Sequence, residues 1–550
     1  MITHLFIYPG ADVPSSLPEN VCASRLPARP ADAARAIDEV LHDPAISTIA
    51  FWDTRLASVP WLQLARFSTG LDDAWHPGAR LSGREEDLLR YVLPTWVNRP
   101  VPDAELAGAI NWRLDPRACF LRASTLRQAG GFDGELETLA GAARELGLRM
   151  IRRGAVLRQQ PSLWSGPQVP EMPSASDRYR LLIKRVSRKW PAYALVRRVI
   201  DGESFLTEAR AWRAAATDRS SKTVEVGALQ RSVEQVAVPD NVSVTVILPT
   251  YGRYRYLAEV LDDLRAQTIR PVQIVIADGN PPEERDHKLY ERYRDLPIEV
   301  IWDEERGMCS ARNACLRRAR GEYVWFVDDD SRFPADNLEA HLRVLAAYGA
   351  DVSVGPAFTR GRPELHAEQR EIACSFMDCG TTVCKKQLID AVGGFDMQFN
   401  SLLPGEDGEL GVRFVRAGGL MVNNPLAKRF HYLAPVGGGR RSSNNLHRWS
   451  RWSLLPRPVQ TVYYTARRHF EPGVEWDAML IASLAVGWRR RDGEQASLRW
   501  RARTLLAEIA ALPITAYRMR KSMKIAEAML DEGPQIPPIA SAQRRPAIKP

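Results

Sequence analysis

Short apolar runs alternate with helical patterns through the middle of the chain. The runs SVTVILPTY, PVQIVIADGN, PIEVIW and EYVWFV lie between residues 243 and 327 and are bounded by Pro, Gly or Asp. The segments YLAEVLDDLRAQT and SARNACLRRARG between them have a helical pattern. Strands that alternate with helices predict βαβ units and a largely parallel sheet. We therefore predict an α/β domain over residues 241–445, with ligands bound at the carboxyl ends of its strands.

An internal repeat extends this pattern to the N-terminal part of the chain. Residues 119–155 (CFLRASTLRQAGGFD…GAARELGLRMIRRGA) parallel residues 382–419, including the words Gly-Gly-Phe-Asp and Glu-Leu-Gly. Further upstream, ISTIAFWDTRL aligns with GEYVWFVDDDS. Ala142 and Ala143 stand where the second half has Glu406 and Asp407. Residues 1–165 are therefore expected to form a degenerate, catalytically inactive copy of the same fold.

The remaining segments are expected to connect and follow these domains. Residues 166–240 are rich in Pro, Ser and charge and contain the basic stretch RYRLLIKRVSRKWPAYALVRRV, which predicts a linker with helices. Helical patterns over residues 446–532 predict a C-terminal helical region. The Pro-rich residues 533–550 are expected to be a disordered tail.

Composition narrows the class of protein. The chain of 550 residues is too long for one core, and it lacks the run of about 20 apolar residues that a membrane-spanning helix needs. The N-terminus does not read as a secretory signal, and the seven cysteines form no CxxC pair. These features predict a cytoplasmic protein. A net charge of +9 suits an anionic substrate, an anionic lipid surface or nucleic acid, and does not choose among them.

Two groups of carboxylates are candidates for chemistry. Asp328 and Asp330 follow an apolar strand, and their alternation puts both on one side, as a hard divalent cation requires. A solvated acidic turn is the alternative. Glu406 and Asp407 open a helix, where the helix dipole favours acids whatever their task. Because the N-terminal copy has alanines at those positions, the fold does not need these acids, and a functional role is favoured.

Two further polar residues flank these carboxylates in the predicted site. His431 follows a strand-like segment and is a reasonable third metal ligand, although such a histidine is more often structural. Arg312 begins a helix after a turn with Gly307, where a guanidinium could meet a phosphate or ribose. Surface solvation would explain a lone arginine equally well.

Five ordered motifs between Val242 and Arg441 resemble the inverting glycosyltransferases of family 2, which have the GT-A fold. These motifs are ILPTYGR, ADGN, SARNACLRRARGEYVWFVDDD, GGFD…GEDGELGVR and HYLAPVGGGRR. The wording ADGNPPEE departs from the commoner Asp-Asp-Gly-Ser. The N-terminal copy lacks the opening motif, the second aspartate and the base.

The resemblance implies a role for each matching residue. The residues implied to bind the nucleotide sugar are Pro249, Thr250, Arg253, Asp278, Arg312, Asp328 and Asp329. Asp330 and His431 would bind the metal, and Asp407, beside Glu406, would be the general base. Arg440 or Arg441 would act when the glycine-rich loop closes. The implied cofactor is Mn²⁺ or Mg²⁺. The implied reaction is a single displacement with inversion, in which Asp407 takes the proton of the attacking hydroxyl.

The function expected from these features is transfer of a sugar from a UDP- or dTDP-linked donor to a glycan or lipid-linked acceptor, in the assembly of a bacterial surface polysaccharide. A non-catalytic glycan-binding or nucleotide-sugar-binding scaffold is the alternative from another class. A nucleotidyltransferase would open with a glycine-rich phosphate loop where this chain reads PTYGRYR. No nucleic-acid reader motif is recognisable, so nucleic acid is not an expected partner.

Two basic stretches, residues 178–198 and 489–524, interleave Arg and Lys with Trp, Tyr and Leu. Such stretches could hold the protein at the cytoplasmic face of the inner membrane, where lipid-linked acceptors reside. Packing of the same helices on the catalytic domain, with solvated basic faces, is the alternative.

Overall fold

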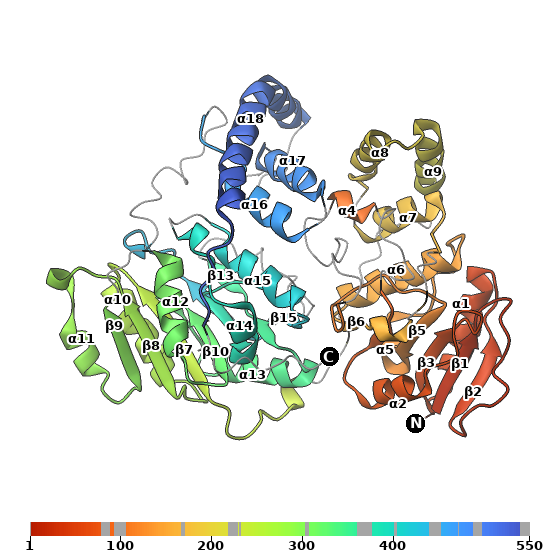
Figure 1. Ribbon diagram of the computed structural model, residues 1–550, viewed down its shortest axis with the longest axis horizontal. Helices are drawn as coiled ribbons and strands as arrows, with labels where there is room; N and C mark the ends of the chain where they lie inside the picture. The colour runs from red at the N-terminus through yellow and green to blue at the C-terminus, as the bar shows by residue number, and fades with distance from the viewer. Residues whose placement is uncertain are drawn as a thin grey trace.

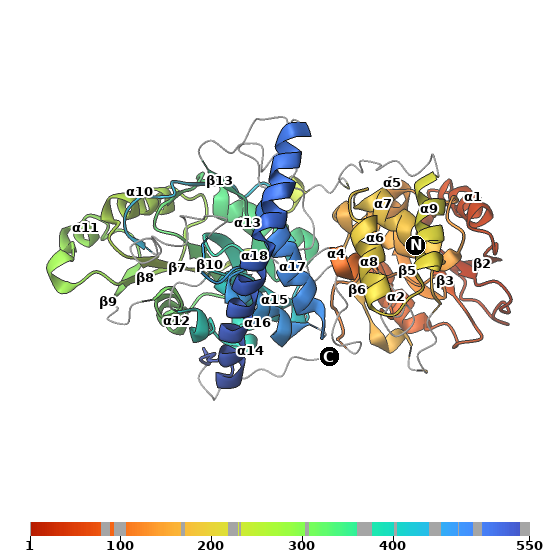
Figure 2. The ribbon, with the colours of Figure 1, turned by 90° about the horizontal axis from the view of Figure 1, so that it is seen from above.

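The computed structural model describes residues 2–78, 88–92, 106–164, 166, 171–186, 188–217, 229, 233–302, 307–359, 377–400, 404–438, 453–470, 472–487 and 498–539. These residues form an N-terminal and a C-terminal part that lie side by side in both views (Figures 1 and 2). Each part has one large sheet flanked by helices. No helix in the described ranges is both long enough and apolar enough to cross a membrane.

The N-terminal sheet is built from residues 2–159. From one edge to the other its strands are β2 (Val21–Arg25), β1 (Ile2–Ile7), β3 (Ile46–Trp52), β5 (Ala118–Arg122), β4 (Ala74–His76) and β6 (Leu157–Gln159). Its helices are α1 (Pro30–Leu41), α2 (Trp61–Thr69), α4 (Leu89–Val92), α5 (Ala123–Ala129) and α6 (Leu139–Arg152). Strand β5 runs antiparallel to β3 and β4, and the other neighbouring strands are parallel.

The central sheet carries the predicted site. From one edge to the other its strands are β15 (Met421–Asn423), β12 (Val352–Val354), β14 (Thr381–Lys385), β10 (Tyr323–Val327), β7 (Val244–Thr250), β8 (Gln273–Asp278) and β9 (Ile298–Trp302). Strands β7, β8, β9 and β10 are parallel, and β14 is antiparallel to β10 and β12. The mostly parallel α/β architecture predicted from the sequence is confirmed.

The continuous apolar runs of β7 and β10 arise because both faces of this sheet are covered. Val246 and Trp325 belong to the core on one face, while Ile247 and Phe326 belong to the core on the other. Helices α10 (Tyr254–Arg265), α11 (His287–Arg292) and α13 (Asn337–Tyr348) contribute to the first core, and α12 (Met308–Arg318), α14 (Lys386–Val392) and α15 (Glu406–Arg416) to the second. The strand ends are left free for ligands.

A small second sheet adjoins the carboxyl end of β10. It consists of β11 (Ser331–Arg332), β16 (Arg429–His431) and β13 (Ala357–Thr359). Its register pairs Ser331 with His431. This pairing holds the histidine beside the acidic residues that follow β10, although about a hundred residues separate them in the chain.

Helices follow each sheet. The segment expected as a linker contains α7 (Ala175–Arg185), α8 (Pro191–Ile200) and α9 (Phe205–Thr217), and the C-terminal region contains α16 (Gln460–His469), α17 (Val474–Gly487) and α18 (Leu498–Glu532). The predicted C-terminal helical region is therefore confirmed. Helix α18 rises above the central domain in Figure 1.

The beginning of the predicted disordered tail is ordered. Residues 533–539 lie against the turn Gly394–Met397, where Gly394 N donates to the carbonyl of Pro537 at 2.9 Å and Met397 N to that of Gln535 at 3.0 Å. Ile539 is buried in the second core. The expectation fails for these residues because the turn offers backbone donors that the tail satisfies. Residues 540–550 lie outside the described residues.

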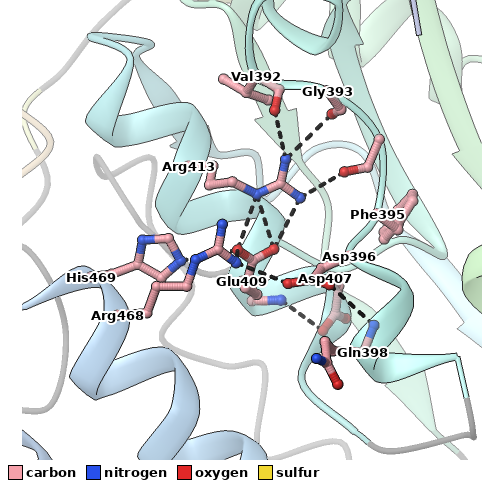
Figure 3. A network of polar contacts seen from close by, with 12 residues as sticks. Val392, Gly393, Phe395, Asp396, Gln398, Asp407, Glu409, Arg413, Arg468 and His469 are labelled. Carbon is pink, nitrogen blue, oxygen red and sulfur yellow. Dashed lines mark hydrogen bonds and ion pairs between the residues drawn. The ribbon is translucent and has the colours of Figure 1, made fainter. Parts of the chain in front are cut away.

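A buried ionic cluster fixes helix α15 against the end of α14 (Figure 3). Glu409, which is fully buried, accepts hydrogen bonds from Arg413, Arg468 and His469 at 2.9–3.0 Å. Arg413 also donates to the carbonyls of Val392 at 2.9 Å and Gly394 at 2.7 Å. The helix start that carries Glu406 and Asp407 is thereby held in place by α14 and α16.

Replacing Glu409 with Gln should destabilise the central domain strongly. The change removes the carboxylate that is paired with the buried Arg413, and breaking a buried ion pair from one side costs about 3–5 kcal/mol. Differential scanning calorimetry at pH 7 should show a clear fall in Tm. Glu339→Gln near the surface of α13 is the control, because a partly exposed i,i+4 pair contributes less than about 1 kcal/mol.

The same cluster predicts how this difference changes with pH. Burial raises the pKa of Glu409, but His469 and Arg413 outweigh it and lower the pKa to about 2. The folded pKa is below the unfolded one, so the contribution to stability is present above roughly pH 4.5 and is lost as the pH falls toward 2. The Tm gap between wild type and Glu409→Gln should therefore narrow from pH 5 to pH 3. A gap that is absent at pH 7, or constant with pH, would contradict this account.

Candidate active site

Asp328, directly after β10, is held between two buried arginines. Its Oδ1 lies 3.4 Å from Nη2 of Arg312, and its Oδ2 accepts a hydrogen bond from Nη1 of Arg429 at 2.8 Å. Burial raises the pKa of Asp328, but Arg429 and Arg312 together hold it well below the usual range. Asp328 is therefore ionised at neutral pH, and its two oxygens are oriented before a ligand arrives.

Asp330 and His431 form the group that could hold a metal ion. Oδ1 of Asp330 lies 3.2 Å from Nε2 of His431, and ligand atoms of Asp328, Asp330 and His431 all lie within 4.8 Å of one another. Burial raises the pKa of Asp330, but the contact with His431 opposes this effect, and the pKa is below its usual value. Carboxylate oxygens with one imidazole nitrogen fit a divalent cation that keeps water and phosphate oxygens as further ligands.

Asp329 points to the loop after β7 and binds two other predicted residues. Its Oδ2 accepts from the hydroxyl of Thr250 at 2.9 Å and its Oδ1 from Nη1 of Arg253 at 2.8 Å. Burial and the neighbouring Asp330 raise the pKa of Asp329 to about 6, against the opposing effect of Arg253. Asp329 thus joins the ends of β7 and β10, with Pro249 one residue before Thr250 in β7.

The glycine-rich loop packs directly on this part of the site. Gly438 N donates to the carbonyl of Tyr251 at 2.8 Å, and Arg253 Nε donates to the carbonyl of Val436 at 2.8 Å. A Cβ on Gly437 would lie 2.4 Å from the Tyr251 oxygen, and Gly437 has φ +67°. Glycine is required here for both the close approach and the backbone conformation. The expected loop residues Arg440 and Arg441 lie outside the described residues.

Asp278, at the end of β8, is fully buried and fully hydrogen-bonded. Its Oδ2 accepts from the hydroxyls of Tyr254 at 2.7 Å and Tyr290 at 2.6 Å, and its Oδ1 accepts from the backbone and side-chain nitrogens of Asn280 at 2.9 and 2.7 Å. In this state it organises the loop around it. Direct contact of Asp278 with a nucleotide remains a prediction.

The start of α15 lies beside the end of β10, and Arg312 joins the two. Its Nη1 donates to Oε1 of Glu406 at 3.0 Å, while its Nη2 faces Asp328. Asp407, the next residue, is partly buried, and Gly408 N donates to its Oδ1 at 2.8 Å. Burial and the adjacent charge of Glu406 raise the pKa of Asp407 to about 7. A carboxyl group with such a pKa can exchange protons near neutrality.

Sequence reasoning missed Arg429 and its second partner. Arg429 Nη2 donates to both oxygens of Asp378 at 3.1 and 3.2 Å. A Cβ on Gly380 would lie 1.2 Å from Arg429 Nη1, so only glycine leaves room for the guanidinium. The sequence signal was slight, because Arg429 stands two residues before His431 and reads as an ordinary basic strand residue.

Residues 245–402 match the family model described as glycosyl transferase family 2. The matched stretch runs from β7 to the turn before α15 and so contains the acidic end of β10.

Several known glycosyltransferases are similar to parts of the chain. Glycosyltransferase GlyA of Streptococcus pneumoniae is 29% identical over 123 residues, which cover 22% of this chain and 18% of that protein. The uncharacterized glycosyltransferase EpsJ of Bacillus subtilis is 36% identical over 89 residues (16% and 26%), and the chondroitin synthase of Escherichia coli is 23% identical over 242 residues (43% and 30%). The chain spans less than a third of the length of each of these relatives.

Two solved structures were also matched. Residues 1–349 of S. aureus TarS match with a TM-score of 0.35 and 16% identity, over 53% of this chain and 92% of that one. The mannosyltransferase PcManGT from Pyrobaculum calidifontis, in complex with GDP-Man and Mn²⁺, matches with a TM-score of 0.32 and 20% identity, over 54% and 82%.

The family model covers the four parallel strands, the helix α12 and the acidic residues at the end of β10, and the matching relatives are named as glycosyltransferases. Residues 245–402 of the central domain are therefore similar to glycosyl transferase family 2.

Proposed function

We propose that the central domain is a metal-dependent, inverting glycosyltransferase that moves a sugar from a nucleoside-diphosphate sugar to an acceptor hydroxyl. The observation that carries this proposal is the position of Arg312, which contacts Glu406 at the start of α15 and Asp328 at the end of β10. The carboxylates that hold the donor and the base that activates the acceptor hydroxyl must lie on either side of the same sugar carbon. The two elements that would supply them meet at this guanidinium.

Asp407 is the proposed general base. Its carboxylate accepts the proton of the acceptor hydroxyl as the hydroxyl oxygen attacks the anomeric carbon, and the bond from that carbon to the diphosphate oxygen breaks. The nucleoside diphosphate leaves with the electron pair, and the configuration inverts. The cluster of Glu409 and Arg413 one turn later holds the base in position.

The donor side is formed by the loop after β7 and the acidic end of β10. Thr250 and Arg253 are held by Asp329, and Arg253 also contacts the glycine-rich loop. Mn²⁺ or Mg²⁺ would be held by Asp330 and His431, where it would supply positive charge beside the leaving diphosphate. The low pKa of Asp330 and the closeness of the two side chains support this assignment.

The proposed donor is a UDP- or dTDP-linked sugar and the proposed acceptor a glycan or lipid-linked glycan of a bacterial surface polysaccharide. Similarity to a chondroitin synthase supports this class of reaction. A nucleotide-sugar-binding scaffold is the alternative. Transfer or hydrolysis assays of the purified protein with a panel of nucleotide sugars, with and without Mn²⁺, distinguish the two, because a scaffold releases no nucleoside diphosphate.

We also propose a peripheral contact with the cytoplasmic face of the inner membrane through α18. Leu506, Ile509 and Tyr517 are exposed, and Arg520 and Lys524 continue the same face of the helix toward its C-terminal end. Exposed apolar side chains together with basic ones are the features by which a helix binds an anionic lipid surface.

Asp407→Asn should abolish most transfer while leaving donor binding nearly unchanged. Loss of a general base costs about 10²–10⁴-fold in rate, and Asn keeps the shape of the side chain. Rates with the active donor and calorimetric titration of that donor measure the two effects. Asp336→Asn at the exposed start of α13 should leave both at wild-type values. Full activity of Asp407→Asn would remove it as the base.

The transfer rate should rise with pH through about 7 and then level off, because Asp407 must be ionised to accept a proton. Glu406→Gln removes the neighbouring negative charge that raises the pKa of Asp407. It also removes the ionic partner of Arg312, whose positive charge lowers the pKa of Asp407. The midpoint of the kcat profile should therefore move to lower pH in this variant. A midpoint that stays in place or moves upward would show that Asp407 does not govern the rate.

The protein should co-sediment with vesicles of anionic phospholipid at low salt and be released at high salt. Leu506→Glu combined with Ile509→Glu should remove most of this binding, because charge replaces the apolar side chains. Vesicles of neutral phosphatidylcholine are the control. Wild-type protein that stays in the supernatant at low salt would end the membrane proposal.

A further inference from the structure

The N-terminal and central sheets have the same strand order. Six strands of each sheet correspond and have the same neighbours: β1 with β7, β2 with β8, β3 with β10, β5 with β14, β4 with β12 and β6 with β15. Strand β9 has no counterpart among the described residues. Each corresponding pair of strands is also parallel or antiparallel in both. The internal similarity therefore extends to a complete sheet topology.

The ionic cluster at the start of α15 has a close counterpart in α6. Glu145 accepts from Arg149 as Glu409 accepts from Arg413, four residues apart in each case. Arg149 donates to the carbonyls of Ala129 and Gly131, as Arg413 does to those of Val392 and Gly394. These carbonyls occupy the same positions around the Gly-Gly-Phe-Asp words.

The helices after each sheet correspond as well. Lys184 of α7 bonds to Asp133 and the next residue, Arg185, to Glu145, just as Arg468 and His469 of α16 bond to Asp396 and Glu409. In both parts a tyrosine lies five residues before the first of these basic residues, Lys184 or Arg468, and contacts a later helix. Tyr179 donates to Glu208 of α9 at 2.9 Å, and Tyr463 donates to Glu527 of α18 at 2.6 Å.

These contacts define two units, residues 2–217 and residues 244–539, each with a sheet and three following helices. Helices α7, α8 and α9 are the counterparts of α16, α17 and α18. The segment expected as a linker is thus part of the N-terminal unit.

The position equivalent to the proposed donor site carries different ion pairs in the N-terminal unit. The strand registers align Arg117 with Gly380, the glycine that leaves room for Arg429. Arg117 forms a two-pronged contact with Asp115, at 2.9 and 2.7 Å, and lies 3.5 Å from Glu171. Asp53, at the position of Asp328, is bonded to its neighbour Arg55 at 2.9 and 2.7 Å. In the N-terminal unit the residues at these positions are therefore paired with each other or with their neighbours.

Equivalent helices of the two units meet at the junction between them. Asp477 of α17 is buried and accepts hydrogen bonds from the hydroxyl of Tyr193 at 2.8 Å and from Nε of Arg197 at 2.7 Å, both on α8. Short helix α4 packs against both α8 and α17 (Figure 1). A buried charge pair across a junction contributes to association only while both partners are present.

We infer that the N-terminal unit is a second copy of the catalytic unit that lacks donor chemistry and serves as its docked partner, through the surface formed by α8, α4 and α17. The chain is a covalently linked pair of like units, in which one member catalyses and the other supplies an interface. The docking contact is independent of the proposed transferase activity, so it can fail without affecting that proposal.

The test measures association of the two units after the full-length protein has folded. A protease recognition site inserted between residues 218 and 228 is cut, and size-exclusion chromatography at low micromolar concentration follows the two pieces. Cut wild-type protein should elute as one species. Asp477→Arg should weaken the association by at least about 30-fold, and Asp477→Arg combined with Arg197→Asp should restore most of it, because the charges are exchanged across the same contact.

Glu283→Arg, on an exposed turn far from the junction in sequence, is the matched control for a charge reversal and should leave the pieces together. If Asp477→Arg does not fold, Tyr193→Phe tests the same contact by removing one hydroxyl, with an expected several-fold weakening. Separate elution of the cut wild-type pieces would overturn the docking. Association that is unaffected by Asp477→Arg or, where that variant does not fold, by Tyr193→Phe would overturn this surface as its site.

Discussion

Negative charge crowds the carboxyl end of β10, and arginines from elsewhere in the fold make that crowding stable. Asp328 lies between Arg312 and Arg429, and Asp329 is bonded to Arg253. Burying these carboxylates without partners would cost several kcal/mol for each ion. The guanidinium groups come from α12, β16 and the loop after β7, so neutralising the acids also brings three separate elements together. The proposed donor site depends on this arrangement more than on any single carboxylate.

The same requirement explains the geometry at the other side of the site. One amino group of Arg312 contacts Asp328 at the strand end and the other contacts Glu406, so the start of α15 is held near the strand by charge. Behind the helix start, Arg413 is paired with Glu409 and donates to backbone carbonyls of the preceding turn. Asp407 therefore stands between an ionic contact in front and a second ionic cluster behind it, and its elevated pKa is a consequence of burial and of Glu406.

Much of the central domain could be predicted, because its signals are local. The apolar runs around Val246 and Trp325 read as strands since both sheet faces are covered, and parallel strands bring their carboxyl ends to one edge. The spacing of Asp328 and Asp330 also indicated that they share a side, and they do lie close to His431. What could not be predicted depends on contacts between distant segments. The sequence does not indicate the contact between Arg429 and Asp378, the hydrogen bonds that fill Asp278, or the packing of helices α7 to α9. Each of these depends on a partner elsewhere in the chain.

The short strap formed by residues 533–539 ties the end of α18 to the turn before the helix of the proposed base. Its backbone completes the hydrogen bonds of Gly394 and Met397, and Gln535 N donates to Asp396, whose other oxygen receives Tyr464 and Arg468. Removing residues 535–537 would therefore leave two backbone donors of the turn that supports the helix of the proposed base without their acceptors.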